Sequence, residues 1–279
     1  MKISEVIKKI EEFQYPNLKP STVRGYKQVY NIFKKKFGNY DIADITSENI
    51  TLFLNELSID LNQSTKHLKF TQLKTLFNFC INVLGSRFVN PCKNQLLTKI
   101  YKNVKNAKRS AISKDTIDEM IYKTQNLRDR VMLELQARCG LRIGEVLKLK
   151  CKNINGRKIT LEEPKSGNKS EIAFMPEFLA ERIQGYIQKN NLQPEDRLIK
   201  RSYGWAKDIV IKSGKRVGIE IRPHDLRRHS ATYASRSGVP IEIVSKIILR
   251  HQDLRTTQIY LGQVSDYEAL HWIDRLYNK

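Results

Sequence analysis

The chain of 279 residues contains no apolar run long enough to cross a membrane, and residues 1–12 form a charged amphipathic stretch rather than a secretory signal. Cysteine is scarce: there are four, no two form a C-x-x-C pair, and they lie mostly within apolar patterns. Disulfides and a zinc site are therefore disfavoured. The sequence also lacks an obvious carboxylate cluster that could hold a metal ion. We expect a cytoplasmic protein without a membrane segment, metal or cofactor.

Positive charge is what the sequence has in excess. Lys and Arg number 50 against 29 Asp and Glu, which gives a formal net charge of +21 and a pI near 9.8. Such an excess is typical of proteins that bind a polyanion, most often nucleic acid. Residues 1–112 hold 19 basic and 8 acidic residues, a net charge of +11, and the remainder carries +10. Both halves are therefore candidates to contact the polyanion, as in a clamp rather than a basic tail.

Helical periodicity dominates the first third of the chain. With the amphipathic N-terminal stretch, it predicts a small bundle of four or five helices as a first domain over residues 1–92. Three residues mark the starts of the expected helices: Ser21 is an expected N-cap for residues 22–37, Thr46 precedes residues 47–57, and Ser64 opens a longer helix.

Basic side chains suggest two surfaces for a nucleic acid. Lys66 and Lys69 lie on a polar face of the third helix, where phosphate contact and plain solvation are both open. Residues 93–112 contain six basic residues and no acid, which predicts a linker that follows the backbone of a bound duplex or is simply solvated. The candidate contacts in this segment are Lys99, Lys102, Lys105, Lys108 and Arg109.

Residues 113–263 predict a second, mainly helical domain. Ser113 is the expected N-cap of its first helix. A helix over residues 127–138 ends before a Gly-Leu turn, so that Arg142 opens the next helix.

A β-hairpin interrupts these helices. Its strands are predicted over residues 157–162 and 171–174, joined by P-K-S-G-N-K-S. Residues 264–279 predict a short amphipathic tail, and packing onto its own domain is the simplest interpretation of its apolar stripe.

Five side chains of the second domain suit attack on a phosphodiester. Arg142 lies in C-G-L-R-I-G-E, His224 and Arg227 lie three apart in R-P-H-D-L-R-R-H, and His251 and Tyr260 lie in L-R-H-Q-D-L-R-T-T-Q-I-Y. A phenol can attack phosphorus, but its free pKa of about 10 requires cationic neighbours or a base. Guanidinium groups hold a phosphate in two-point contacts, and imidazole can accept or donate the proton.

Each of these residues alone has an ordinary explanation. An arginine after a glycine turn can cap a helix, a histidine can be structural, and Tyr260 is one of 12 tyrosines. Together, in this order, they resemble the tyrosine recombinases, the phage-integrase and Xer family. The resemblance covers residues 113–260 strongly and the N-terminal bundle more loosely. It implies a mainly α fold: an N-terminal core-binding, SAM-like helical bundle and a mainly helical catalytic domain with a small antiparallel β-sheet.

The resemblance also implies roles for these five side chains. Arg142 and Arg227 look like the two phosphate-binding arginines of the family, and Tyr260 matches its nucleophile. His224 resembles the residue that assists proton transfer from the nucleophile. His251 matches the second histidine, which bonds the scissile phosphate.

Four further residues take supporting roles by the same resemblance. Lys165 looks like the general acid on the β-hairpin, with Lys169 as a rival. Glu145 resembles an acidic position that buttresses the active site, and a surface or helix-pairing role is equally open. Arg250 is a departure, because relatives commonly have glycine there. We expect it to change local packing or to add a phosphate contact.

The expected activity is site-specific DNA recombination through a 3′-phosphotyrosine and a Holliday junction, without ATP or metal. The expected partners are double-stranded DNA with inverted half-sites and three further copies of the chain, in a homo-tetramer on two DNA sites. Residues 264–279 are expected to dock on the neighbouring protomer, and an accessory activator protein is left open. Two alternatives remain: a type IB topoisomerase-like enzyme that relaxes DNA, and a non-catalytic DNA-binding or architectural protein.

Overall fold

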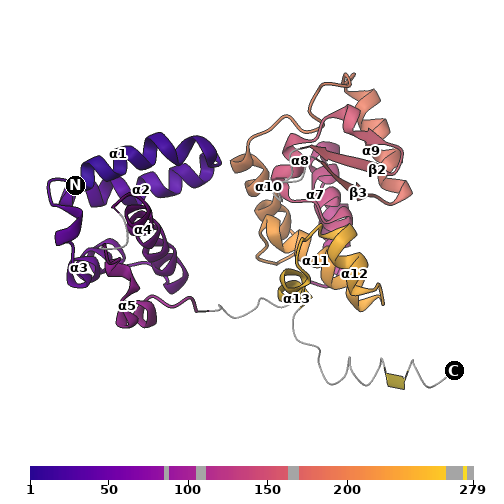
Figure 1. The fold of residues 1–279 in the computed structure, drawn as a ribbon. Coiled ribbons are helices and arrows are strands. Elements are labelled where there is room, and N and C mark those ends of the chain that lie inside the picture. The colour runs from indigo at the N-terminus through magenta and orange to yellow at the C-terminus, as the bar shows by residue number, and fades with distance from the viewer. Residues whose placement is uncertain (85–87, 105–110, 163–169, 262–272, 275–279) are drawn as a thin grey trace. The chain divides into compact units, whose positions relative to one another are not determined.

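The computed structural model describes residues 1–84, 88–104, 111–162, 170–261 and 273–274, with the main chain alone at residues 84, 259 and 260 (Figure 1). The chain divides into two compact units, Met1–Ala107 and Lys108–Lys279. Both units are mainly helical, and three short strands lie in the second. Among the described residues, no helix combines the length and apolar character needed to span a membrane.

The first unit is a helical bundle around one apolar core. In α1, the buried residues Ile3, Val6, Ile7 and Ile10 repeat at helical spacing and form one stripe. Aromatic rings fill the centre, where Phe33 packs edge-on against Phe53 and Phe77. The helices of the unit are α1 (Ile3–Phe13), α2 (Pro20–Phe37), α3 (Ser47–Leu57), α4 (Gln63–Leu84) and α5 (Gln95–Ile100).

The predicted helix starts meet different outcomes. Thr46 caps α3, because its side chain accepts a hydrogen bond from the Asn49 N–H. Ser21 is not a cap: α2 begins at Pro20, whose missing N–H suits the first helical position. Ser64 does not open α4, which begins one residue earlier at Gln63, and the Asn62 carboxamide accepts the Thr65 N–H.

The basic segment after residue 92 begins as part of the bundle rather than as a linker. Helix α5 occupies Gln95–Ile100, and Leu97 and Tyr101 are buried in the core of the first unit. The Tyr101 hydroxyl donates to Asn55 Oδ1 at 2.9 Å. The linker predicted over residues 93–112 therefore starts too early. The two units divide after Ala107, in the later part of this segment. Residues 105–110 lie outside the described residues.

The second unit is built around a buried helix with an antiparallel sheet beside it. The sheet has the order β1-β2-β3, and Leu161 pairs with Glu171 in its register. The two long strands were predicted, and the two-residue β1 was not. The elements are α6 (Lys114–Tyr122), α7 (Leu127–Cys139), α8 (Ile143–Lys148), β1 (Ile154–Asn155), β2 (Lys158–Glu162), β3 (Ser170–Phe174), α9 (Glu177–Lys189), α10 (Tyr203–Lys215), α11 (Pro223–Arg236), α12 (Ile241–Ile243), the π-helical turn η5 (Val244–Ile248) and α13 (Leu254–Leu261).

Helix α7 lies at the centre of this unit, and the chain that follows it leads to α8 (Figure 1). It is buried almost all round and packs against α11, α9, α6 and α8. It ends at Gly140, whose φ of +61° is the left-handed conformation that favours glycine. A Cβ at this position would lie 2.7 Å from the Ile248 carbonyl oxygen. This close approach brings the start of α8 beside η5.

Candidate active site

Arg142 is held at the start of α8 by an acidic residue one turn later. Its main-chain N–H donates to Glu145 Oε2 at 2.8 Å, and its Nη1 donates to Glu145 Oε1 at 2.6 Å. The Glu145 carboxylate thereby caps the first turn of α8, and its negative charge is favourable at a helix N-terminus. The guanidinium is 28% exposed, so it is fixed by Glu145 and still accessible from solvent.

Arg227 lies on α11 and is almost completely buried, with 1% of its side chain exposed. Its Nη1 donates to the Gly140 carbonyl and its Nη2 to the Leu249 carbonyl. It lies 3.9 Å from Glu145 Oε2. Arg227 thus joins the turn after α7 to the end of η5, and it places a second positive charge beside Arg142.

His251 follows η5 and is buried. Its Nδ1 lies 3.0 Å from Thr257 Oγ1, which lies 2.9 Å from Ser245 Oγ. Burial lowers the pKa of His251 to about 4, and the positive charges of Arg227, Arg142 and Arg250 add to the effect. The imidazole is therefore neutral at neutral pH.

His224 occupies the first turn of α11 and keeps an exposed edge. Desolvation lowers its pKa, as does the charge of Arg227, and Arg142 acts in the same direction. Arg227, Arg142 and His224 also lower the pKa of His251, so these side chains lie close enough to interact electrostatically. The structure thus brings together four of the side chains that the sequence singles out.

Tyr260 lies in α13, which packs against α11 and η5. The main chain therefore brings the position of Tyr260 to the elements that carry Arg227 and His251. Five predicted site residues lie outside the described residues: Lys165, Lys169, Lys105, Lys108 and Arg109. Four predicted DNA contacts lie in the first unit, half-buried on α4 (Lys66 and Lys69) and exposed on and after α5 (Lys99 and Lys102).

Arg250 lies inside the protein and does not extend outward toward a phosphate, so of its two expected roles the structure agrees with local packing. Its side chain is 3% exposed, and its Nη2 donates to Glu145 Oε2 at 3.0 Å and to the Gly140 carbonyl at 3.2 Å. Burial would raise the pKa of Glu145, but Arg250 and Arg142 outweigh it, and the pKa lies below its ordinary value. Glu145 is consequently an ionised anchor between two arginines, and Arg250 belongs to the packing of the site.

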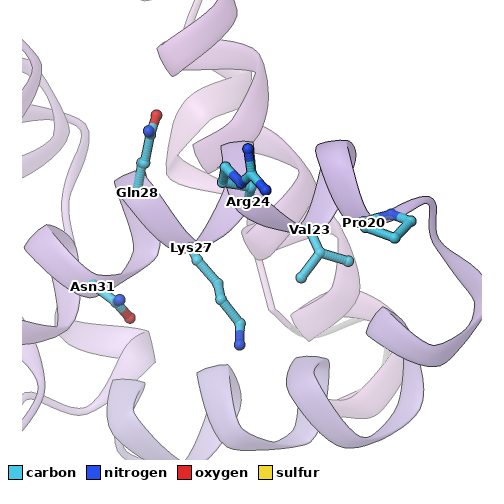
Figure 2. A pocket seen from close by; sticks show the side chains of 6 residues that line it. All are labelled: Pro20, Val23, Arg24, Lys27, Gln28 and Asn31. Carbon is cyan, nitrogen blue, oxygen red and sulfur yellow. The ribbon is translucent and has the colours of Figure 1, made fainter. Parts of the chain in front are cut away.

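The described part of the first unit has a shallow hollow along α2 (Figure 2). None of the predicted site residues lines it. It is lined by Pro20, Val23, Arg24, Lys27, Gln28 and Asn31.

Comparison with known proteins agrees with this arrangement. The model of the phage integrase family matches residues 110–265, and the model of the phage integrase N-terminal SAM-like domain matches residues 4–58. The chain belongs to the phage integrase family. The predicted family is thereby confirmed, and so is the predicted class of enzyme, a tyrosine recombinase that carries out site-specific recombination.

Relatives and solved structures extend over most of the recombinase chain. A tyrosine recombinase of Pseudothermotoga lettingae is 29% identical over 250 residues, which cover 85% of this chain and 84% of the relative. Tyrosine recombinase XerA of Saccharolobus solfataricus is 27% identical, covering 82% and 78%. The Tn1549 transposon integrase in complex with transposon right end DNA has a TM-score of 0.78 at 16% identity, with 99% of each chain covered. A lambda integrase dimer bound to a COC′ core site has a TM-score of 0.75 at 17% identity, covering 94% and 96%. The predicted fold class is confirmed.

Three site residues were not found from the sequence. The buried Thr257 contacts the His251 ring, the buried Ser245 contacts Thr257, and Glu171 of β3 faces Arg250. The only available signal was polar residues within apolar patterns, which is too common to select them. The Thr-Thr pair before Tyr260 matched the order of the family motifs, but not the contact that Thr257 makes.

Proposed function

We propose that this recombinase cleaves double-stranded DNA by forming a covalent bond between Tyr260 and a 3′ phosphate, and then rejoins the strands in a new arrangement. The observation that carries the proposal is the convergence of Arg142, His224, Arg227 and His251 next to α13, the helix that bears Tyr260. A phosphotyrosine retains the energy of the broken phosphodiester. Rejoining to another strand therefore requires neither ATP nor a metal ion.

The two arginines provide the charge that the transition state needs. Negative charge grows on the non-bridging oxygens during attack on phosphorus, and preorganised guanidinium donors stabilise it. Arg142 is the partly exposed one, so we expect it to make the direct phosphate contact. The buried Arg227 adds positive charge and holds the Gly140 turn in place.

The histidines are suited to moving the phenolic proton. Both rings are poised to be neutral at neutral pH, because burial and the arginines lower their pKa values. A bound phosphate would offset these positive charges and raise both pKa values, which makes the rings better proton acceptors when substrate is present. We assign proton transfer from Tyr260 to His224 and a phosphate hydrogen bond to His251.

The leaving 5′ oxygen needs an acid, and an arginine cannot supply the proton at neutral pH. Lys165 is our candidate, with Lys169 as the rival. The strands on either side, β2 and β3, carry this segment, and β3 approaches the site through Glu171. The free 5′-hydroxyl that results is the nucleophile for rejoining.

The remaining parts of the proposal concern assembly and location. Structures similar to this chain include integrases in complex with DNA and a lambda integrase tetramer bound to a Holliday junction. We propose that four copies of this chain assemble on two DNA sites with inverted half-sites, with residues 264–279 docking between protomers, and with or without an accessory activator. We place the reaction in the cytoplasm, where the four buried, unpaired cysteines would stay reduced.

Covalent trapping tests the proposal. A duplex is selected for binding from a random-sequence pool and nicked beside the expected cleavage site, so that the cleaved strand diffuses away. The parent chain should form a covalent protein–DNA complex in the presence of EDTA, and Tyr260→Phe should form none. A complex that persists in Tyr260→Phe, or that disappears on adding EDTA to the parent, would contradict the mechanism. Strand exchange between two marked duplexes then separates recombination from simple relaxation of supercoils.

A further inference from the structure

Arg250 occupies a backbone conformation that an arginine rarely adopts. Its φ is +52°, in the left-handed region where a Cβ is unfavourable and glycine is common. Strain of this kind persists where the surrounding contacts over-determine the conformation. The side chain is buried beside the active site, so those contacts are to be found within the protein.

Two carboxylates from different parts of the second unit meet the Arg250 guanidinium. Its Nη2 lies 3.0 Å from Glu145 Oε2 on α8, and its Nε lies 3.5 Å from Glu171 Oε2 on β3. Its Nη1 donates to the Ile248 carbonyl at 2.8 Å, at the end of η5. One side chain therefore touches α8, β3 and η5 at once.

The burial pattern of β3 is arranged for this contact. Side chains alternate between the two faces of a strand. In β3 the outer face carries the apolar side chains: Ile172 and Phe174 are 41% and 51% exposed. The inner face carries the carboxylate of Glu171, whose side chain is 9% exposed. An inward carboxylate is costly unless a cation meets it. Arg250 is that cation.

We propose that Arg250 is a positioning residue, which fixes β3 relative to the phosphate-binding end of α8 by pairing with Glu171 and Glu145 together. Glu145 in turn holds Arg142 through two hydrogen bonds, so the chain of contacts runs from β3 to the guanidinium that faces the phosphate. This inference rests on the proposed function, in which the segment preceding β3 supplies the general acid. The pairing sets the distance between the general acid and the scissile phosphate, although Arg250 itself does not touch the substrate.

Removing the arginine would take away the cation that faces the buried Glu171 and one of the cations that face Glu145, and such a loss threatens folding itself. The decisive variant is therefore Glu171→Gln, which breaks only the β3 contact and leaves the pair of Arg250 with Glu145. We expect single-turnover cleavage of the selected nicked duplex to slow about a hundredfold, the loss that a misplacement of about 1 Å produces. DNA affinity should stay within about twofold of the parent, because no proposed phosphate contact is changed.

A modified substrate distinguishes positioning from general damage. When sulfur replaces the bridging 5′ oxygen of the scissile bond, the thiolate leaves without protonation. Glu171→Gln should then cleave at nearly the parent rate. Equal slowing on both substrates, or cleavage of the normal duplex at the parent rate, would overturn the inference while the proposed function stands. A parent chain that forms no covalent complex would overturn both.

The matched control is another buried ion pair of the second unit. Glu134 on α7 is 4% exposed and pairs with Arg182 on α9. Glu134→Gln loses a buried carboxylate of the same kind without touching Arg142, Arg227 or Arg250. It should lower the melting temperature at least as much as Glu171→Gln and leave the cleavage rate unchanged. If the two variants slowed cleavage alike, the effect would be a general loss of stability, and the proposed role of Arg250 would be wrong.

Discussion

At the residue scale, the charge state of His251 is set by its neighbours. The ring is buried and three guanidinium groups act on it, so its pKa is lowered from 6.5 to about 4. The hydrogen bond to Thr257 orients the ring without requiring it to be charged. The neutral ring can therefore remain next to two phosphate-binding arginines without adding to their mutual repulsion.

This predicts a loss of stability on acidification. The pKa of His251 is lower in the folded chain than its value of 6.5 in the unfolded chain. As the pH falls, the unfolded chain therefore binds a proton at this ring before the folded chain does. The contribution of His251 is fully present above pH 6.5 and disappears between about 6.5 and about 4. A tenfold difference in proton affinity between the folded and unfolded chain corresponds to about 1.4 kcal/mol, so a pKa lowered from 6.5 to about 4 corresponds to about 3.4 kcal/mol. Screening by solvent reduces this figure, so the loss should be on the order of 2–3 kcal/mol.

Urea denaturation across this pH range, with the parent and His251→Asn side by side, measures the effect. The asparagine can keep a hydrogen bond to Thr257 but cannot titrate. The free energy of unfolding of the variant should depend less on pH between 6.5 and 4. Parallel curves for the two proteins would mean that His251 titrates at its ordinary pKa, against our expectation.

At the element scale, the turn after α7 organises the site. The Gly140 carbonyl accepts hydrogen bonds from both Arg227 and Arg250, and the residue has a φ of +61°. Gly140→Ala would strain this conformation and place a Cβ 2.7 Å from the Ile248 carbonyl oxygen. We expect a loss of about 1–3 kcal/mol in the free energy of unfolding and slower covalent trapping, because both arginines would shift with the turn.

Gly185→Ala is the matched control for that substitution. Gly185 lies inside α9, and a Cβ there would meet no atom within 4 Å. Alanine in a helix interior is favoured over glycine by about 1 kcal/mol, so this variant should be slightly more stable than the parent and equally active. Similar urea midpoints for the two alanine variants would show that the Gly140 turn tolerates a side chain.

Local chemistry determined which elements could be predicted. The N-cap Ser113 and the helix start after Thr46 could be predicted because a cap is a contact between residues three positions apart. The π-helical turn η5 could not be predicted, since its wider hydrogen-bond spacing leaves no mark in the composition. The burial of α5 was hidden by the basic residues of its segment, because the two residues that anchor it, Leu97 and Tyr101, do not form a long apolar pattern.

The site was predictable to the extent that its residues lie in ordered motifs. Arg142, His224, Arg227 and His251 could be selected because the motifs appear in the family's order. The inward direction of Arg250 could not, since it depends on Glu145, which is 105 residues away, and on Glu171 in a separate strand. An arginine beside a predicted phosphate site suggests a phosphate contact until the buried carboxylates are visible.

At the scale of the whole molecule, the net charge of +21 is divided almost evenly along the chain. An even division favours a protein whose two units both contact DNA, and the strength of such contacts depends on salt. Each neutralised phosphate contributes about 0.9 to the slope of the logarithm of the binding constant against the logarithm of salt concentration. The slope therefore counts contacts without knowledge of the target sequence.

Lys66 and Lys69 on α4 test whether the first unit contributes to that count. If both contact phosphates, the variant with Lys66→Gln and Lys69→Gln should bind any duplex more weakly and with a slope smaller by about 2. The control with equal net charge replaces Lys36 and Lys150, which already pair with Glu56 and Glu195. Because these lysines are neutralised within the protein, the control should keep the parent slope. An unchanged slope in the α4 variant would show that these two lysines are solvated and contact no phosphate.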